Sequence, residues 1–315
     1  MPDENRRVKV SATVITFNEE QDIEECLKSI LWADEIVVVD SLSIDRTVDI
    51  TKQYTDKVYE NPFPGFAAQK NFAAEKASGD WILQLDADER IPPSLRDEIL
   101  STVAKPDACD LYYIPRRNYW LGHWIRHGGW YPDFAARLFR RGKGRWVGFT
   151  HEKFVIDGTS GMLKEDLFHD NLKSVHEHVQ KQLISTIQEV REAAQNDLRL
   201  VWFIPPSIII RMLKGFAKGP INWLTIRLLY KDMIKNKIEI IWLMPFYPVL
   251  KFLYMYILRL GFLDGAPGFW VAALSAVYTT IRYAKLWEYA HGGKHRVIPS
   301  DEEMRTYYRS WWPSG

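Results

Sequence analysis

Short apolar runs alternate with amphipathic segments along the N-terminal part of the chain. The apolar runs are rich in β-branched residues and end in polar ones, which is typical of buried strands; they are 8–16, 35–40, 57–60 and 81–86. The segments between them repeat apolar residues at helical spacing; they are 18–31, 45–54 and 66–77. Strand and helix alternate with short connections, so the order predicts a doubly wound α/β domain with a mostly parallel sheet.

Polar side chains stand where three of these predicted strands end. Thr16 ends the first strand, Asp40 the second and Asp86 the fourth. Ligands of open α/β sheets bind outside the carboxyl ends of the strands, so we expect these side chains to share one crevice. The chain contains neither GxGxxG nor GxxxxGK[ST]. A Rossmann dinucleotide loop and a P-loop are therefore both unsupported.

The stretch QLDADERI, residues 84–91, places Asp86 and Asp88 two positions apart. In an extended Asp-x-Asp both side chains lie on the same side of the backbone and can reach one hard divalent cation. Mg²⁺ and Mn²⁺ prefer oxygen ligands that are shared with substrate phosphates. The alternative is an acidic turn that caps a helix near residues 92–100, and spacing alone leaves both interpretations open.

Four motifs follow one another in an order known from one enzyme family. TVITFNEE, EIVVVDSLSIDRT, AAQKN and LQLDADERI resemble the family 2 nucleotide-sugar glycosyltransferases with the GT-A fold, over roughly residues 8–160. Within that family the chain is most similar to the lipopolysaccharide-core β-1,4-glucosyltransferase branch, through WYPDFAARLFRRGKGRW, the pair His151-Glu152 and KFLYMYILRLGFLDGAPGF. Leu42 and Arg46 depart from the pattern, because the family often has glycine there.

The resemblance implies roles for individual residues. The nucleotide-binding residues would be Thr16, Asn18, Glu19, Asp40, Lys70 and Asn71. Among them, Asp40 would recognise the uridine ring or ribose, and Lys70 and Asn71 would contact the nucleotide or its diphosphate. Asp86 would lie near the ribose or donor sugar and share a divalent cation with its direct ligand, Asp88. That cation would be Mg²⁺ or Mn²⁺, and it would neutralise a nucleoside diphosphate leaving group.

An inverting transfer also needs a base near the acceptor hydroxyl. The candidates are Glu152 and Asp133, and we prefer Glu152 because it follows a basic hairpin that should close over the donor. The neighbouring His151 would complete the metal shell or contact phosphate. The alternatives are an ordinary surface glutamate for Glu152 and a half-buried structural histidine for His151.

The stretch 119–141 is both aromatic and basic. Its aromatic residues could stack on a sugar and its arginines could hold phosphates; these residues are Trp124, Trp130, Tyr131, Arg137, Arg140 and Arg141. The alternative is a half-exposed strand in which Leu138 and Phe139 alternate with arginine. Three further histidines, His169, His176 and His178, are expected at or before a helix and not in a zinc site.

Charged residues are distributed unevenly along the chain. Residues 1–199 carry 26 Lys+Arg and 33 Asp+Glu, whereas residues 200–300 carry 13 and 4, and seven of the 13 tryptophans follow residue 200. Basic, aromatic and apolar residues together are typical of a nucleic-acid surface or an anionic membrane face. The N-terminus has no apolar run of a secretory signal, and the two cysteines, Cys26 and Cys109, fit buried thiols in a reducing compartment.

The C-terminal part favours a membrane interface. After a helix expected over 174–197, apolar stretches cover 200–213, 238–262 and 268–287, but prolines and charges interrupt each of them before the ~20 apolar residues of a spanning helix. We expect helices that lie in the interface or enter it shallowly. Core helices of an ordinary α-helical domain are the alternative. Nucleic acid is disfavoured, because no binding motif accompanies the basic residues.

Together these patterns predict a GT-A catalytic domain over 1–173, a helical membrane-associating region over 174–300 and a tail over 301–315. The predicted activity is inverting, metal-dependent transfer of a hexose, with glucose preferred, from a UDP-sugar to a lipid-anchored glycan such as lipopolysaccharide inner core. The expected location is the cytoplasmic face of the inner membrane. Transfer to a polyprenyl-phosphate or other lipid-linked sugar, nucleotidyl transfer and a non-catalytic scaffold are the alternatives.

Overall fold

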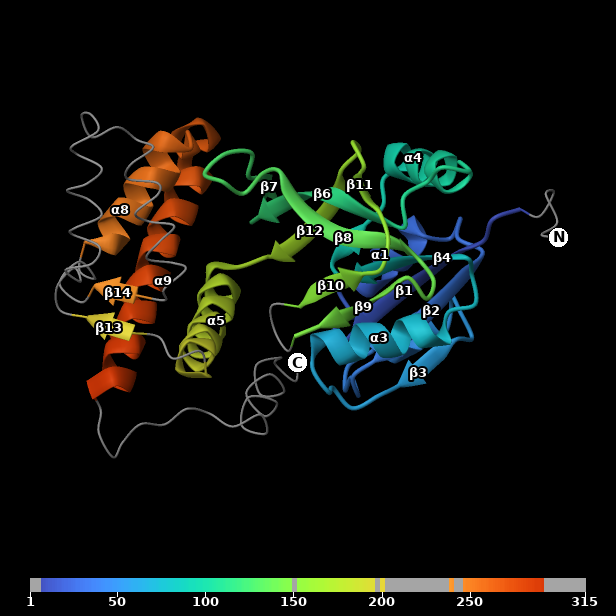
Figure 1. Ribbon diagram of the computed structural model, residues 1–315, viewed down its shortest axis with the longest axis horizontal. Coiled ribbons are helices and arrows are strands. Elements are labelled where there is room, and N and C mark those ends of the chain that lie inside the picture. The colour runs from blue at the N-terminus through green and yellow to red at the C-terminus, as the bar shows by residue number, and fades with distance from the viewer. Residues whose placement is uncertain (1–6, 149–151, 196–198, 202–237, 241–245, 292–315) are drawn as a thin grey trace. The chain divides into compact units, whose positions relative to one another are not determined.

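The computed structural model describes residues 7–148, 152–195, 199–201, 238–240 and 246–291 (Figure 1). The chain separates into two compact units, with the division between Val175 and His176. Each unit is described below by itself.

The N-terminal unit is built on a large mixed sheet whose strands run in the order β3-β2-β1-β4-β8-β6-β12-β5 (Figure 1). Strands β3, β2, β1 and β4 are mutually parallel, and β8 pairs antiparallel with both β4 and β6. The strands are β1 (Val10–Thr16), β2 (Glu35–Asp40), β3 (Val58–Glu60), β4 (Trp81–Asp86), β5 (Glu89–Arg90), β6 (Leu111–Trp120), β8 (Asp133–Arg140) and β12 (Leu167–Leu172). The mixed, mostly parallel α/β sheet expected from the sequence is confirmed.

Three shorter pairings complete this unit. Strands β7 (His123–Trp124) and β11 (Ser160–Met162) pair with β6 beside the main path of the sheet. A separate antiparallel hairpin consists of β9 (Gly144–Val147) and β10 (Lys153–Ile156). This hairpin matters for the site, because Glu152 directly precedes β10.

The helices cover the sheet from both faces, because side chains alternate along each strand. The helices are α1 (Ile23–Ser29), α2 (Thr47–Thr51), α3 (Phe66–Lys76) and α4 (Pro93–Val103). One face of the sheet packs against α1, α2 and α4 in a single apolar cluster. The other face packs against α3 and the β9–β10 hairpin. Figure 1 shows α3 and α4 on opposite sides of the sheet.

Local sequence explains the helix that leads from β1. Ile23, Cys26, Leu27 and Ile30 recur every three or four residues and are fully buried, while Glu24 and Glu25 in the first turn favour the helix dipole. Each fully buried side chain of this size contributes roughly 2 kcal/mol. Cys26 is a buried free thiol, as expected, whereas Cys109 is a free thiol that is only partly buried.

The C-terminal unit contains α5 (Val175–Gln195), a two-stranded parallel pair and a helical hairpin. The strand pair is β13 (Arg199–Val201) with β14 (Ile238–Ile240), so the start of the apolar stretch at 238–262 forms a strand where a helix was expected. The hairpin consists of α8 (Tyr247–Leu253), a π-helical segment (Tyr254–Leu258), a 3₁₀ segment (Gly261–Asp264) and α9 (Gly265–His291).

Within this unit, α5 and α9 are joined by polar contacts. Tyr278 donates to Glu189 at 2.5 Å, Arg282 forms an ion pair with the same carboxylate, and Lys285 donates to Thr186 at 2.8 Å. In the described part of the chain, no helix has by itself the length and apolar character needed to cross a membrane. The segments Tyr247–Leu258 and Gly261–Tyr289 meet that criterion only as a pair bent by 71°.

Candidate functional site

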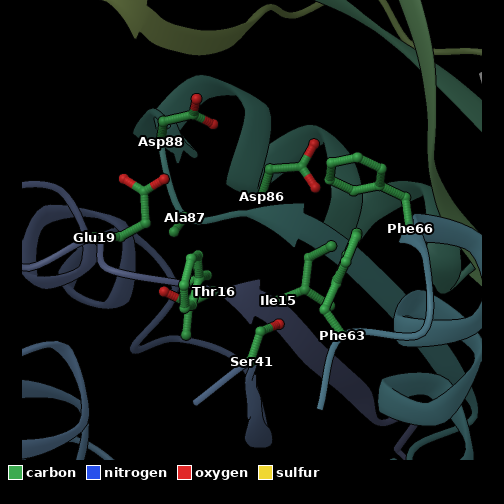
Figure 2. Close-up of a pocket in the computed structure, with 10 residues that line it drawn as sticks. Ile15, Thr16, Glu19, Ser41, Phe63, Phe66, Asp86, Ala87 and Asp88 are labelled. Carbon is green, nitrogen blue, oxygen red and sulfur yellow. The ribbon is translucent and has the colours of Figure 1, made fainter. Parts of the chain in front are cut away.

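The carboxyl ends of β1, β2 and β4 meet in one place. Thr16 pairs in register with Asp40, and Ile15 pairs with Asp86. A pocket opens beside these ends and is lined by Ile15, Thr16, Phe17, Glu19, Ser41, Phe63, Phe66, Asp86, Ala87 and Asp88. Figure 2 shows Glu19 and Asp88 on one side of this pocket and the rings of Phe63 and Phe66 on the other. The pocket therefore offers carboxylates opposite an aromatic wall formed by Phe63 and Phe66.

The aromatic wall lies on the segment that leads into α3. The Phe63 and Phe66 rings contact each other edge to face, with centroids 5.0 Å apart. Such rings can stack on a nucleobase. The sequence analysis missed both residues, although the segment NPFPGF stands between a predicted strand and a predicted helix.

Two loops at the pocket floor are tied to each other. The Asn18 backbone N–H donates to Ser43 Oγ at 2.8 Å, and its side chain accepts the Ile44 N–H at 2.8 Å. Leu42 has a φ of 68°, in the left-handed region that favours glycine. Leucine thus keeps the backbone conformation that glycine adopts easily. Asn18 joins the two loops through these hydrogen bonds, and its predicted contact with the nucleotide stays a prediction.

Asp40 ends β2 and is almost fully buried. Its Oδ2 accepts the Ser43 N–H at 2.7 Å, and its Oδ1 accepts the Ser43 hydroxyl at 2.5 Å. Burial raises the pKa of Asp40 above its usual value, although the bonds from Ser43 oppose that shift. The carboxyl group is therefore held rigidly beside the pocket, and its recognition of uridine stays a prediction.

Lys70 joins two of the predicted site residues. Its side chain is 2% exposed, and Nζ lies 2.7 Å from Glu152 Oε1 and 3.1 Å from Asp86 Oδ1. The ammonium group also lies over the Trp146 ring, 4.9 Å from its centroid. Helix α3 thus presents one buried cation to both carboxylates, which neutralises their mutual repulsion.

Arg137 continues this line of charges on the other side of Asp86. Its Nη2 donates to Asp86 Oδ2 at 2.5 Å and to Glu89 Oε1 at 2.6 Å, and the side chain is 3% exposed. Burial acts to raise the pKa of Asp86, but Arg137 and Lys70 outweigh it and hold that pKa well below the usual range. Burial acts to lower the pKa of Arg137, but the two carboxylates raise it overall.

The line extends as far as the second candidate base. Glu89 is fully buried and lies 3.5 Å from Arg116 Nη1, and Arg116 donates to Asp133 Oδ2 through Nε at 3.0 Å and Nη2 at 2.6 Å. Oppositely charged groups therefore alternate from one candidate base to the other, in the order Glu152, Lys70, Asp86, Arg137, Glu89, Arg116 and Asp133. No role in the site was predicted for Arg116 from the sequence.

Asp88 faces a histidine that the sequence analysis placed near a helix. His169 lies in β12, and its Nε2 is 3.6 Å from Asp88 Oδ1. The Asp170 backbone N–H donates to the Asp88 carbonyl at 3.1 Å, which holds β12 against the turn after β4. Only the spatial pairing of β12 with β5 reveals this neighbour, because the two lie far apart in sequence.

Asp88 and His169 are the residues that could hold a metal ion at this site. The described residues contain no group of three or more His, Cys, Asp or Glu side chains arranged for a metal. Two protein ligands still suit Mg²⁺ or Mn²⁺, because these cations take remaining oxygens from substrate phosphates and water. Asp86 is held instead by Lys70 and Arg137, so its predicted share in the metal stays untested. His151 lies outside the described residues.

Other predicted residues have structural partners. The Asn71 side chain exchanges two hydrogen bonds, each of 2.9 Å, with the backbone of Trp146 in β9. Arg140 lies over the Trp81 ring, and Arg141 donates to the Gly79 carbonyl at 2.8 Å. Leu138 and Phe139 are buried, so β8 is not a half-exposed strand at those positions. The predicted ligand contacts of Asn71 and the arginines stay predictions.

The sheet and its pocket agree with the sequence family. The family model described as "Glycosyl transferase family 2" matches residues 11–170, about half of the chain. This chain belongs to glycosyl transferase family 2. The match begins one residue into β1, and it covers β2 to β8 and all the pocket-lining residues, so the candidate site of this family 2 enzyme lies within the family domain.

Two curated relatives are similar to this chain, and the match to one of them is longer than that domain. The lipopolysaccharide core biosynthesis glycosyltransferase LpsC of Rhizobium meliloti is 31% identical over 224 residues, which are 65% of this chain and 81% of LpsC. An uncharacterized glycosyltransferase of Rickettsia bellii is 46% identical over 92 residues, 29% of this chain and 31% of that protein.

Solved structures are similar at lower identity. The mannosyltransferase PcManGT of Pyrobaculum calidifontis, solved with GDP-Man and Mn²⁺, is 18% identical, with 91% of this chain and 89% of that chain covered and a TM-score of 0.47. Glucosyl-3-phosphoglycerate synthase of Mycobacterium tuberculosis, solved with Mg²⁺ and UDP, is 23% identical over 35% of this chain and 44% of that chain, with a TM-score of 0.31.

Proposed function

We propose that this family 2 enzyme is an inverting, metal-dependent hexosyltransferase. It transfers a hexose, with glucose the preferred choice, from a UDP-sugar to a lipid-anchored glycan such as lipopolysaccharide inner core. The observation that carries the proposal is the pocket in which Asp88 and Glu19 face Phe63 and Phe66. A nucleoside diphosphate has the matching shape, because its base is flat and its phosphates need a cation among carboxylates.

We propose one orientation for the donor in this pocket. The uracil stacks beside Phe63 and Phe66, and its ribose approaches Asp40 at the end of β2. The diphosphate lies toward Asp88 and His169, whose oxygen and nitrogen atoms suit Mg²⁺ or Mn²⁺. A divalent cation bound there supplies positive charge to the leaving diphosphate. Lys70 adds a buried ammonium group beside Asp86.

Glu152 acts as the general base. It accepts the proton of the acceptor hydroxyl while that oxygen bonds to the anomeric carbon on the face opposite UDP. The bond from the anomeric carbon to the diphosphate breaks, and its electron pair departs with UDP, so the configuration inverts. Lys70 holds Glu152 Oε1 and so fixes the position of the carboxylate. The Glu152 side chain is 17% exposed. Asp133 is the second candidate, at the other end of the charge line.

The acceptor proposal rests on a relative and on the C-terminal unit. LpsC is described as acting in lipopolysaccharide core biosynthesis. The α8 hairpin exposes a row of large apolar side chains, namely Phe246, Val249, Leu250, Leu253, Ile257 and Leu258, with exposed fractions from 40% to 69%. Apolar residues at this spacing form one helix face, and a membrane interface can cover it. Peripheral attachment to the cytoplasmic face of the inner membrane follows.

The predicted membrane interface also depended on basic residues of the C-terminal part. Those at 211–237 lie outside the described residues. Lys251 and Arg259 are described, and both are exposed beside the apolar row. Their charges suit anionic headgroups. The surface therefore combines apolar and basic groups in the way that an interfacial helix requires.

The experiment is a donor screen on the full chain in lipid nanodiscs. UDP release is measured for UDP-glucose and other UDP-hexoses, with lipopolysaccharide core or polyprenyl phosphate as acceptor, and with and without EDTA. We expect UDP release with a core acceptor, loss of activity in EDTA and recovery with Mn²⁺. Activity on polyprenyl phosphate alone would favour that acceptor, and pyrophosphate release would indicate nucleotidyl transfer. Full activity in excess EDTA would contradict the metal-dependent mechanism.

A further inference from the structure

Asn118 links the two sides of the candidate site through a single amide group. It lies in β6, where it pairs in register with His169 of β12. Its Oδ1 is 2.6 Å from His169 Nδ1, while its Nδ2 donates to Asp133 Oδ2 at 3.1 Å and to the Trp130 carbonyl at 3.3 Å. One short side chain therefore contacts the histidine beside Asp88 and the second candidate base.

The partners of Asn118 determine which way its amide points. Asp133 Oδ2 and the Trp130 carbonyl oxygen are both acceptors, so the NH₂ group must face them. A flipped amide would place its oxygen against two oxygens and lose both hydrogen bonds. The Asn118 oxygen consequently faces His169 Nδ1, and this contact is a hydrogen bond only if Nδ1 carries a proton.

This bond has a consequence for the opposite nitrogen of the ring. A neutral imidazole protonated at Nδ1 has its lone pair on Nε2. His169 Nε2 faces Asp88 Oδ1 at 3.6 Å, which is too long for a direct hydrogen bond. A lone pair and a carboxylate oxygen then point toward the same space, which is the donor set of a divalent cation.

We propose that Asn118 is a positioning residue that selects the Nδ1–H tautomer of His169 and so presents Nε2 to the metal ion beside Asp88. The inference rests on the proposed metal-dependent function, and it assigns to Asn118 a part in cation affinity. The same amide holds Asp133 through its NH₂ group, so it joins the metal side of the site to the acceptor side. Outer partners of metal-binding histidines commonly act in this way.

The first test observes the tautomer directly, without substrate or metal. Full-length protein labelled with ¹⁵N-histidine is studied in nanodiscs at about pH 8, above the usual histidine pKa, and His169→Gln assigns the signal. We expect the long-range ¹H–¹⁵N pattern of the Nδ1–H tautomer for His169, and a mixture of tautomers in Asn118→Leu. A wild-type protein with the Nε2–H tautomer would overturn the proposal.

The second test measures Mn²⁺ affinity by the EPR signal of free Mn²⁺. We expect Asn118→Leu to weaken binding about 10- to 100-fold, whereas Asp133→Asn should leave it near wild type because the Asn118 oxygen still faces His169. Asn118→Asp retains an acceptor for the His169 Nδ1–H. When Asn118→Asp is combined with Asp133→Asn, residue 133 becomes the donor and residue 118 the acceptor of the hydrogen bond between them. Both of these proteins should bind Mn²⁺ far better than Asn118→Leu.

The variants separate two kinds of failure. If His169→Ala weakens Mn²⁺ binding and Asn118→Leu does not, the role of Asn118 is wrong and the metal site survives. If His169→Ala binds Mn²⁺ as tightly as wild type, His169 is not a ligand of the cation and the inference is wrong. If Asn118→Asp is as weak as Asn118→Leu even with Asp133→Asn present, an acceptor at residue 118 is not what positions the ring.

Discussion

Lys70 Nζ lies 2.7 Å from Glu152 Oε1, and this contact joins α3 to the segment that precedes β10. The two residues are 82 positions apart in the sequence. Because the Lys70 side chain is 2% exposed, its charge is stabilised mainly by the carboxylates of Glu152 and Asp86. The pair therefore fixes where the preferred base stands relative to the end of β4.

Lys70→Met should reduce stability and activity together. Removing one partner from a buried ion pair leaves uncompensated charge, which costs about 3 kcal/mol of unfolding free energy. Denaturant unfolding and UDP-release assays measure the two effects. Lys76→Met is the matched control, since Lys76 is exposed on the same helix. Equal effects of the two substitutions would show that the buried pair has no special role.

Glu152→Gln and Asp133→Asn should distinguish the two candidate bases. Loss of a general base lowers kcat about 10²- to 10⁴-fold, whereas donor binding should change little because each amide keeps its shape. We expect the large decrease for Glu152→Gln. Single-turnover transfer and UDP binding by calorimetry separate the two quantities. The opposite ranking would make Asp133 the base and Glu152 a partner of Lys70.

His178 should make the C-terminal unit sensitive to acid. Burial lowers the pKa of His178 from 6.5 to about 4, while the unfolded chain takes up that proton near pH 6.5. Stability linked to this group is therefore complete above about pH 6.5 and decreases as the pH falls toward 4, by about 3 kcal/mol. Thermal unfolding across this window measures the loss.

His178→Gln should flatten that dependence, because it removes the buried titrating group. His176→Gln is the control, since His176 is exposed on the same helix. An unchanged pH dependence in His178→Gln would place the acid sensitivity elsewhere in the protein.

Charge on the exposed apolar row of α8 and the π-helical segment that follows it should weaken membrane attachment. Leu250 is 56% exposed and Leu258 is 69% exposed, and both side chains would enter the lipid interface. Leu250→Glu and Leu258→Glu each place a carboxylate there instead. Flotation with anionic vesicles should show less bound protein, and UDP binding should be unaffected. Met162→Glu is the control, because Met162 is 66% exposed in the other unit. Unchanged flotation of both leucine variants would contradict the interfacial role of α8 and the π-helical segment that follows it.

Much of the N-terminal fold follows from local patterns. The strands 35–40 and 81–86 were predicted with the bounds that β2 and β4 have, because continuous apolar runs between polar residues leave little freedom. The convergence of Thr16, Asp40 and Asp86 also followed, since parallel strands end at one edge. Ends of short elements were less well predicted; α2 covers Thr47–Thr51 where a helix over 45–54 was expected.

The partners within the site could not be predicted in the same way. His169 lies before a helix, as expected, but its position in β12 beside Asp88 was not predicted, because β12 pairs with β5 across a long stretch of chain. Arg137 was expected to hold phosphate, and that contact stays a prediction, but its burial between Asp86 and Glu89 was not predicted. Nothing local to either residue marks these contacts, since they depend on strand order.

The sequence by itself determined the alternating α/β elements, the edge at which the polar residues gather and the family of the enzyme. These depend on residues close together in the chain, whose spacing decides whether they form a strand or a helix. The tertiary structure alone decided which charges meet: Lys70 with Glu152, Arg137 with Glu89, and Asn118 with His169. Such pairs form because long-range strand pairing and burial bring distant groups together and leave each buried charge in need of a partner.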